Sequence, residues 1–250
     1  MIDIENSIKL FSQYVNNYDI SNPKILSKYK HTFRVMENSK VIAKELGLNN
    51  EDVDLAMLIG LLHDIGRFEQ AVKFDSYGAH VPFDHAKYGV EVLKKDNYID
   101  EFIVNKRIQD IVLTAVNNHN KYCIDEGLDD RTLLFCKIIR DADKLDILNK
   151  EVTEEFNFSN STISDDIYDF FVNKELVDDK KVQTDLDFEL RHMAFIFDIN
   201  FNCTYEIIKN KNIIDKVFDR FIEINSNEKE KLKKIKNMLN NYIEGEINVR

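Results

Sequence analysis

Six histidines supply the residues of this chain best suited to metal chemistry: His31, His63, His80, His85, His119 and His192. Histidine is the commonest metal ligand among side chains. His63 is followed directly by Asp64, so an imidazole and a carboxylate lie side by side in the sequence. A single helical histidine is more often a hydrogen-bonded structural residue than a ligand. The hypothesis of a metal site therefore depends on how these residues combine.

Two of the histidines end apolar helix faces. The stripe before His63 repeats with the period of a helix and consists of Leu55, Leu58, Ile59 and Leu62. Gly60 and Ala56 precede His63 by three and seven residues, and their small size leaves room for another backbone or a bound group beside the imidazole. His119 ends a second apolar face. A polar ring in such a place must find a partner or stay at the surface.

Two aspartates compete for the role of an acidic ligand further along the chain. Asp141 and Asp143 each share a helix face with apolar residues. An ionised carboxylate on such a face is costly unless it pairs or binds a cation. Asp143 could instead be a surface carboxylate paired with Lys144 or Arg140. Periodicity alone does not choose between the two aspartates.

Four segments in this order resemble the signature of the HD-domain superfamily, an all-helical group of metal-dependent phosphohydrolases. The segments are His31, the run His63-Asp64-Ile65-Gly66-Arg67, the run Asp84-His85-Ala86-Lys87-Tyr88-Gly89, and the run Asp141-Ala142-Asp143-Lys144-Leu145-Asp146. The resemblance covers about residues 25–150. A lone His-Asp pair is weakly specific, whereas four matching segments in family order are strongly specific.

The resemblance implies a ligand set for two metal ions. One ion would be held by His31, His63, Asp64 and Asp143, and a second by Asp64, His85 and His119, with Asp64 bridging. It thereby selects Asp143 over Asp141. Nitrogen and oxygen ligands of this kind suit one or two divalent transition metal ions, namely Fe, Mn, Ni, Co or Zn. We expect no organic cofactor.

The resemblance also implies the reaction, the hydrolysis of a nucleotide or other small phosphoester as a phosphomonoesterase or phosphodiesterase. Two cations about 3.5–4 Å apart lower the pKa of a shared water molecule and neutralise phosphoryl oxygens. Asp64 would orient that water as a catalytic residue. Arg67, placed in both the catalytic and the substrate-binding set, would grip the phosphate, and its alternative is a surface ion pair with Glu69 or Asp75.

Two further residues are candidates for substrate binding, and one alternative reaction stays open. His80 and Lys144 could contact the substrate, and the alternatives are a surface or packing role for His80 and a solvent-facing position for Lys144. Some HD-like proteins with a similar ligand set hold two irons in mixed valence and use oxygen to cleave a C–C or C–P bond. The ligands alone do not distinguish a hydrolase from such an oxygenase.

The elements that position these residues are expected to be helices. The 250 residues include only 7 Gly and 2 Pro, which favours helix over a turn-rich β fold. We predict an all-α, single-domain helical bundle of the HD type over residues 1–250. Its metal-binding core would occupy about residues 25–150, and accessory helices about residues 160–245. Helical periodicity is lost over residues 66–84, which predicts an ordered loop, and residues 177–187 are the candidate hinge.

Charge and cysteine content limit the partners and the compartment. The formal net charge is −11, so an acidic surface disfavours non-specific nucleic-acid binding. The 3 cysteines have no CxxC spacing, which is typical of thiols in a reducing cytoplasm. We find no signal peptide and no apolar run long enough for a membrane span, and expect a cytoplasmic enzyme. The expected partner is a small phosphorylated substrate, and a homodimer is a further candidate.

Overall fold

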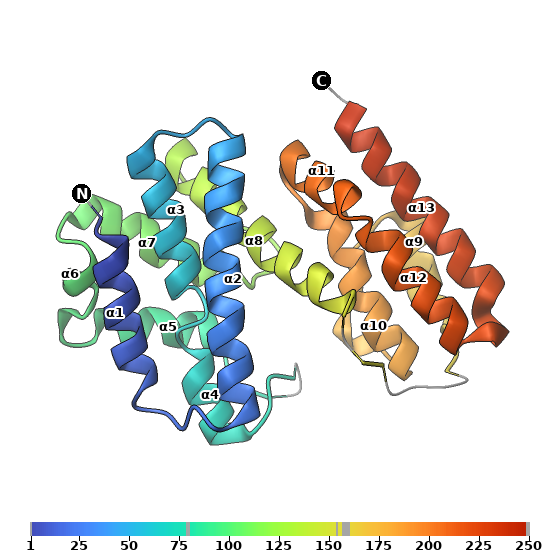
Figure 1. The fold of residues 1–250 in the computed structure, drawn as a ribbon, viewed down its shortest axis with the longest axis horizontal. Helices are drawn as coiled ribbons and strands as arrows, with labels where there is room; N and C mark the ends of the chain where they lie inside the picture. The colour runs from blue at the N-terminus through green and yellow to red at the C-terminus, as the bar shows by residue number, and fades with distance from the viewer. Residues whose placement is uncertain (1, 79–80, 154, 157–160, 249–250) are drawn as a thin grey trace. The chain divides into compact units, whose positions relative to one another are not determined.

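The computed structural model describes residues 2–78, 81–153, 155–156 and 161–248, and in these residues it contains helices and no strand. The all-α prediction is confirmed. The first eight helices are α1 (Ile4–Val15), α2 (Pro23–Glu45), α3 (Asn50–Leu62), α4 (Arg67–Phe74), α5 (His85–Lys94), α6 (Ile99–Phe102), α7 (Lys106–Asn118) and α8 (Asp130–Glu151). The remaining ones are α9 (Asp165–Asn173), α10 (Asp185–Met193), α11 (Asn202–Asn210), α12 (Ile213–Ile224) and α13 (Lys229–Asn248) (Figure 1).

Local sequence signals begin and end the helices that carry the site. Asn22 caps α2 by accepting a hydrogen bond from a backbone N–H, and Pro23 is the first residue of the helix. Gly47 follows the helix with φ of +71°, a left-handed conformation that glycine adopts readily. Asn49 caps α3 in the same way as Asn22 caps α2.

The loop predicted for residues 66–84 is wrong in its first half, because residues 67–74 form α4. Phe68 and Ala71 are buried on the inner face of this helix, and the Phe68 ring packs against Phe11 of α1 with 5.8 Å between centroids. A helix of eight residues is too short to show a clear period. Further along the chain, extended backbone at Ile103 separates α6 from α7.

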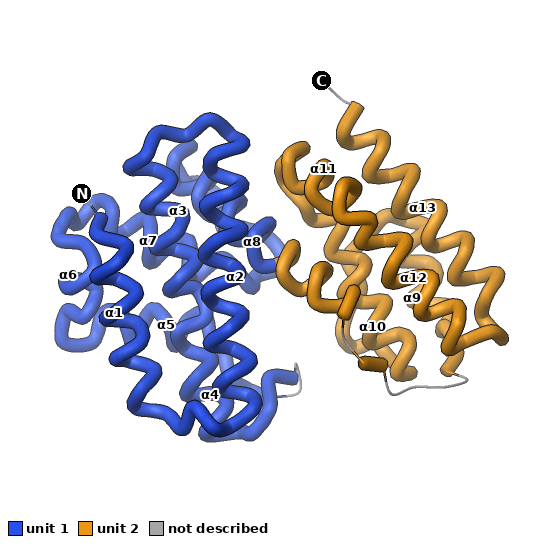
Figure 2. The backbone as a smooth tube through the Cα atoms, in the orientation of Figure 1, with its two compact units in different colours: residues 1–143 blue, residues 144–250 orange. Residues whose placement is uncertain are grey.

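The backbone divides into two compact units, residues 1–143 and residues 144–250 (Figure 2). The boundary lies inside the continuous helix α8, between Asp143 and Lys144. The sequence has no Gly-rich or Pro-rich linker at that point. Folding of the whole chain as one domain stays a prediction.

Two glycines let the helices of the first unit approach closely. A Cβ atom at Gly60 of α3 would lie 2.8 Å from Met36 Cα and 2.8 Å from Ser39 Oγ, both on α2. A Cβ atom at Gly66 would clash with the carbonyl oxygen of His85, the first residue of α5. The small residue before His63 therefore makes room for another backbone. Gly60 allows the helix of His63 to pack closely against the helix of His31, and Gly66 allows the turn after Asp64 to pack closely against α5.

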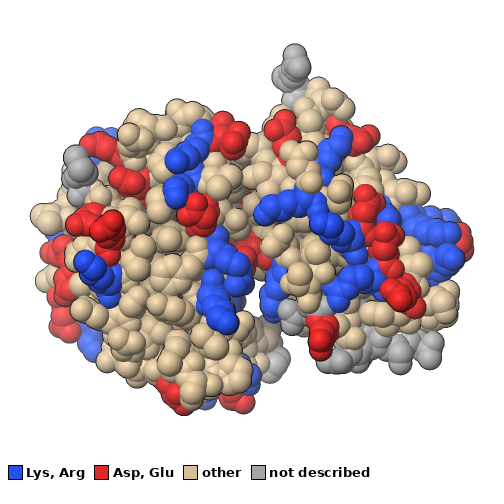
Figure 3. All heavy atoms as spheres, viewed as in Figure 1, with Lys and Arg blue, Asp and Glu red and all other residues tan. Residues whose placement is uncertain are grey.

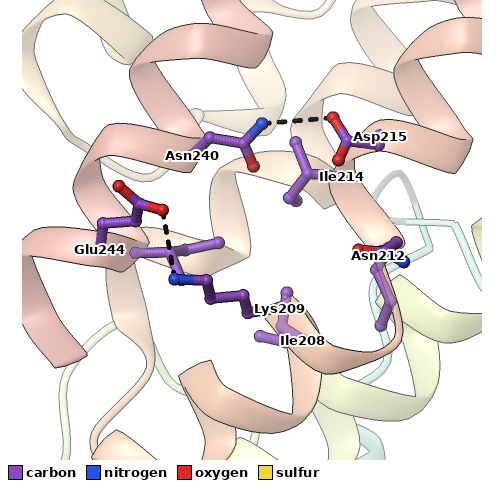
Figure 4. A pocket seen from close by; sticks show the side chains of 9 residues that line it. Ile208, Lys209, Asn212, Ile214, Asp215, Asn240 and Glu244 are labelled. Atoms are coloured by element: carbon purple, nitrogen blue, oxygen red, sulfur yellow. Dashed lines mark hydrogen bonds and ion pairs between the residues drawn. The ribbon is translucent and has the colours of Figure 1, made fainter.

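The second unit has its own apolar core. Leu145, Leu148 and Phe218 are among its buried residues. A cavity of about 190 Å³ lies among α11, α12 and α13 (Figure 4). Four of its polar side chains pair with one another, since Lys209 Nζ lies 3.1 Å from Glu244 Oε1 and Asn240 Nδ2 donates to Asp215 Oδ1 at 3.3 Å. We therefore assign no chemistry to this cavity.

Hydrogen bonds to Asp187 hold the C-terminal end of the candidate hinge over residues 177–187. The Asp187 carboxylate is buried and accepts hydrogen bonds from the backbone N–H groups of Ser164, Gln183 and Thr184 at 3.0, 3.1 and 3.2 Å. These bonds tie the segment to the start of α9 and to the first turn of α10. Among the described helices of both units, none is long and apolar enough to cross a membrane.

Candidate metal centre

Six side chains from five helices or their ends gather in the first unit. They are His31 on α2, His63 and Asp64 at the end of α3, His85 at the start of α5, His119 at the end of α7, and Asp143 on α8. These are the six metal ligands implied by the sequence, and the structure brings all of them together. Three overlapping groups of them have ligand atoms within 4.8 Å of one another.

The ring of His63 is oriented by the backbone of its own helix. Its Nδ1 lies 2.8 Å from the carbonyl oxygen of Gly60. Because a carbonyl only accepts, Nδ1 carries the proton and Nε2 has the lone pair. Nε2 is buried, has no hydrogen-bond partner among the described residues, and lies 3.6 Å from Asp64 Oδ2 and 3.9 Å from Asp143 Oδ1. A lone pair facing two carboxylates is repelled by them unless a cation lies between.

His119 repeats this arrangement on the other side of Asp64. Its Nδ1 donates to the carbonyl oxygen of Val116 at 2.7 Å, which leaves the lone pair on Nε2. That atom lies 3.1 Å from His85 Nε2 and 3.5 Å from Asp64 Oδ1. Outer hydrogen bonds of this kind fix the tautomer of metal-binding histidines.

Asp64 lies between two sets of imidazoles. Its Oδ2 is 3.5 Å from His31 Nε2 and 3.6 Å from His63 Nε2, and its Oδ1 is 3.4 Å from His85 Nε2 and 3.5 Å from His119 Nε2. Each carboxylate oxygen therefore faces a different group. This is the arrangement that a carboxylate bridging two ions requires.

The protonation states suit metal binding. Burial lowers the pKa of His63 to about 4, against the opposing effect of Asp64 and Asp143, so the imidazole is neutral near pH 7. Burial and then Arg67 hold the pKa of His85 well below its usual value. Burial alone would raise the pKa of Asp64, but Lys28 and His63 more than offset it and lower that pKa well below the usual value. Neutral imidazoles around an ionised carboxylate are the forms that ligate cations.

The structure separates the two competing aspartates of α8. Asp143 Oδ1 lies 3.2 Å from His31 Nε2, whereas the fully buried Asp141 belongs to none of the candidate ligand groups. The site is built from nitrogen and oxygen atoms, so its composition fits a divalent transition metal. The residues present thus fit the metal ions that the sequence implies, and the role of each residue as a ligand stays a prediction.

One cationic side chain that the sequence predicts as a phosphate ligand, Arg67, points toward the candidate metal centre. Arg67 Nε lies 3.5 Å from Asp64 Oδ1, and its Nη1 donates to Gln70 Oε1 at 2.8 Å. The two acids considered as its surface partners pair elsewhere, Glu69 with Lys73 at 3.1 Å and Asp75 with Lys24 at 2.6 Å. Arg67 is thus turned toward the centre.

Lys28 is a cation that the sequence analysis missed, and its Nζ lies 2.8 Å from Asp64 Oδ2. Its position one helical turn before His31 was the available signal, because residues three apart share a helix face. Lys144 lies 2.8 Å from Asp198 Oδ2, and its substrate contact stays a prediction. His80 lies outside the described residues.

A second cluster of metal-ligand residue types lies in the second unit. Glu151, Glu189 and His192 have ligand atoms within 4.8 Å of one another. His192 Nδ1 is 3.0 Å from Glu151 Oε1 and 4.0 Å from Glu189 Oε2. On the other edge of the ring, Arg191 Nη2 lies 2.9 Å from His192 Nε2.

Comparison with known proteins agrees with this geometry. The family model of the HD domain matches residues 29–148. Among curated proteins the chain is 37% identical over 102 residues to ribonuclease Y of Mycoplasma mycoides subsp. mycoides SC, and 36% identical over 102 residues to that of Mycoplasma capricolum subsp. capricolum. It is 35% identical over 91 residues to ribonuclease Y of Staphylococcus epidermidis.

These matches cover only part of each protein. Each spans 36% of this chain, and 18%, 18% and 14% of the respective relatives, so the chain spans less than a fifth of their length. No solved structure gives a significant match. The family match contains the six clustered residues. Residues 29–148 of this chain are therefore an HD domain.

Proposed function

We propose that this protein is a metal-dependent phosphohydrolase that cleaves a nucleotide or another small phosphoester at a centre for two metal ions. The observation that carries the proposal is the convergence of lone pairs on Asp64. The Nε2 atoms of His63 and His119 face opposite oxygens of this one carboxylate, at 3.6 and 3.5 Å. Hydrogen bonds from their Nδ1 atoms to backbone carbonyls fix both tautomers.

Different residues would bind the metal ions, orient the water molecule and hold the phosphate. His31, His63, Asp64 and Asp143 would hold one ion, and Asp64, His85 and His119 the other. When bound, the ions would lower the pKa of a water molecule and neutralise charge on the phosphoryl oxygens. Asp64 would accept a hydrogen bond from that water and orient it. Arg67 would hold a phosphoryl oxygen, because its guanidinium is turned toward the centre and guanidinium groups bind phosphate bidentately.

A small substrate fits the charge of the molecule better than a long nucleic acid. Basic and acidic side chains are interspersed on the face shown in Figure 3, and the net charge is −11. Lysines of α13 pair with acids, since Lys236 Nζ lies 3.0 Å from Asp215 Oδ1 and Lys231 Nζ lies 3.4 Å from Asp165 Oδ1. An acidic surface repels a phosphate backbone.

A phosphodiester in RNA is the second candidate substrate. The observation that favours it is the ribonuclease name of the relatives, although the chain spans less than a fifth of their length. A mixed-valence diiron oxygenase is the alternative in another reaction class, because a similar ligand set serves both chemistries. Requirement for oxygen separates the two classes.

The test is metal analysis of anaerobically purified protein combined with a substrate panel. The panel contains p-nitrophenyl phosphate, bis-p-nitrophenyl phosphate, nucleoside mono-, di- and triphosphates, and short RNA oligonucleotides, each assayed with and without oxygen. We expect up to two transition metal ions per chain and oxygen-independent phosphate release. The Asp64→Asn variant is the inactive reference. A fully active enzyme without bound metal and insensitive to chelators would contradict the proposal.

A further inference from the structure

Lys28 places a positive charge beside Asp64, the carboxylate that we propose as the ligand shared by the two metal ions. Its Nζ lies 2.8 Å from Asp64 Oδ2, the oxygen that faces His31 and His63. The Lys28 side chain is 20% exposed, so it is partly withdrawn from water beside this carboxylate. An anionic partner stabilises such a group, because a charge partly withdrawn from water is unfavourable when it is unpaired.

Tyr77 holds Lys28 and Arg67 near one another. The Lys28 ammonium lies 5.4 Å from the centroid of the Tyr77 ring, and the Arg67 guanidinium carbon lies 5.6 Å from it. The ring is fixed in turn, because its hydroxyl donates to the carbonyl oxygen of Lys24 at 3.1 Å. Both cations lie within about 6 Å of the centre of one aromatic ring, and the ring attracts both electrostatically. This arrangement concentrates positive charge where an anion would have to approach.

Metal binding at Asp64 would remove the charge that neutralises the Lys28 ammonium group. If both oxygens of Asp64 ligate cations, the carboxylate can no longer neutralise the ammonium group, which then faces like charges a few ångströms away. Burial prevents water from screening this repulsion fully. Lys28 must then either leave the centre or acquire a new anion.

We infer that Lys28 and Arg67, held by Tyr77, form a phosphoryl-binding site, and that Lys28 exchanges Asp64 for a phosphoryl oxygen when metal ions bind. The inference rests on the proposed function and names the chemistry recognised beside the metal ions, a tetrahedral phosphoryl anion. It has an unusual consequence. Lys28 opposes metal binding before the anion arrives and stabilises the complex afterwards.

The experiment measures the two effects separately in the full-length chain. Mn²⁺ binding to metal-free Lys28→Met and wild-type proteins is measured by calorimetry, and inorganic phosphate binding is then measured on the Mn²⁺-loaded proteins. We expect Mn²⁺ affinity to rise by about three- to tenfold, because a competing cation is removed. Phosphate affinity should fall by at least about tenfold, because a charge-assisted hydrogen bond is lost.

Two further variants calibrate the result. Lys28→Arg keeps the charge and a charge-assisted hydrogen bond to phosphate, and should retain phosphate affinity within about threefold. Lys40→Met is the matched control, since Lys40 lies on the same helix and pairs with the exposed Glu37 at 3.0 Å. It should change neither affinity. Circular dichroism melting checks the fold of each variant, and Lys28→Gln replaces Lys28→Met if the latter does not fold.

The outcomes separate this inference from the proposed function. A parallel loss of Mn²⁺ and phosphate affinity would show a structural Lys28 and overturn the inference, as would unchanged phosphate affinity. If no phosphoester in the panel is cleaved but the two affinities move in opposite directions, the proposed hydrolysis fails and the phosphoryl site stands. If phosphoesters are cleaved and the phosphate affinity of Lys28→Met equals that of wild type, only the inference fails.

Discussion

The two units each contain a cluster of histidine and carboxylate side chains, but the hydrogen bonds of the histidine rings differ between the two clusters. In the first unit, backbone carbonyls of Gly60 and Val116 accept the Nδ1 protons of His63 and His119. In the second unit, a side chain contacts each ring nitrogen of His192. The two clusters therefore have the same kinds of side chain with ligand atoms within 4.8 Å of one another, but their histidine rings form different hydrogen bonds.

The direction of the lone pairs decides what each cluster can hold. Arg191 Nη2 can only donate, so His192 Nε2 accepts and its Nδ1 carries the proton toward Glu151 Oε1 at 3.0 Å. The lone pair of His192 is thus used by a guanidinium group, and the carboxylate receives a proton donor. The lone pair of His63 instead faces Asp64 with no hydrogen-bond donor among the described residues. His119 Nε2 lies between Asp64 Oδ1 at 3.5 Å and His85 Nε2 at 3.1 Å. A set of ligand residue types becomes a metal site only when the lone pairs converge.

The largest expected effect comes from removing the shared carboxylate of the first cluster. Asp64→Asn would take away the negative charge between the two proposed cations, and a neutral amide is a poor bridge. Both metals should be lost together and turnover should disappear, while the near-isosteric side chain preserves the fold. Elemental analysis and phosphoesterase assays of the variant measure this effect.

Asp141→Asn is the control for this substitution, since Asp141 lies outside the candidate ligand groups. It should keep both metals, with at most a reduction of about 10–100-fold in affinity if Asp141 orients a ligand. Metal lost from Asp141→Asn and kept in Asp143→Asn would place the last ligand on the other face of α8.

A smaller effect should follow when only one side of Asp64 is changed. His119→Ala removes one lone pair from the group with His85 but leaves the group of His31 and His63 intact. The second ion should be lost and much of the first retained. Activity should fall by about 100-fold or more, because one cation lowers the pKa of water less than two. Measuring the metal content and the hydrolysis rate of His119→Ala tests this prediction. Full metal content and a wild-type rate would mean that His119 is structural.

The smallest effect is expected in the second cluster, and it concerns stability. His192→Gln should leave metal content unchanged and lower the free energy of unfolding by about 1–3 kcal/mol, because Glu151 and Arg191 lose a buried hydrogen-bonding partner. Metal analysis and urea titration provide the two readouts. Loss of metal from this variant would contradict the distinction between the clusters.

The same variant has a defined pH signature. Burial, and then Arg191, lower the pKa of His192 to about 4 from the ordinary 6.5. The unfolded chain therefore binds a proton near pH 6.5 that the folded chain accepts only near pH 4, so stability falls as pH falls through this window. The loss is about 3 kcal/mol at most. The stability of His192→Gln should vary less between pH 6.5 and pH 4 than that of wild type.

The helical class and the grouping of the six candidate ligand residues could be predicted from the sequence for different physical reasons. Helices follow from local signals such as Pro23, Gly47 and the apolar stripe of α3. The gathering of six ligands depends on contacts between distant segments, and only the resemblance to a family supplied it. Periodicity could not separate Asp141 from Asp143, because both share a helix face with apolar residues.

Other features could not be predicted because nothing local marks them. The division of the chain falls in the middle of α8, where the helix is continuous. The short α4 depends on packing of Phe68 against α1. Lys28 is one of many lysines in the sequence, and only the approach of α2 to α3 places it beside Asp64.

The close approach at Gly60 and Gly66 has a consequence for protein design. The six ligands could be copied onto another helical bundle with correct residue types and chain order, and the copy would still fail if either position carried a side chain. A Cβ atom at Gly60 would separate α2 from α3, and one at Gly66 would displace α5 and with it His85. A transplantable version of this centre therefore consists of eight positions, two of which are defined by the absence of a side chain.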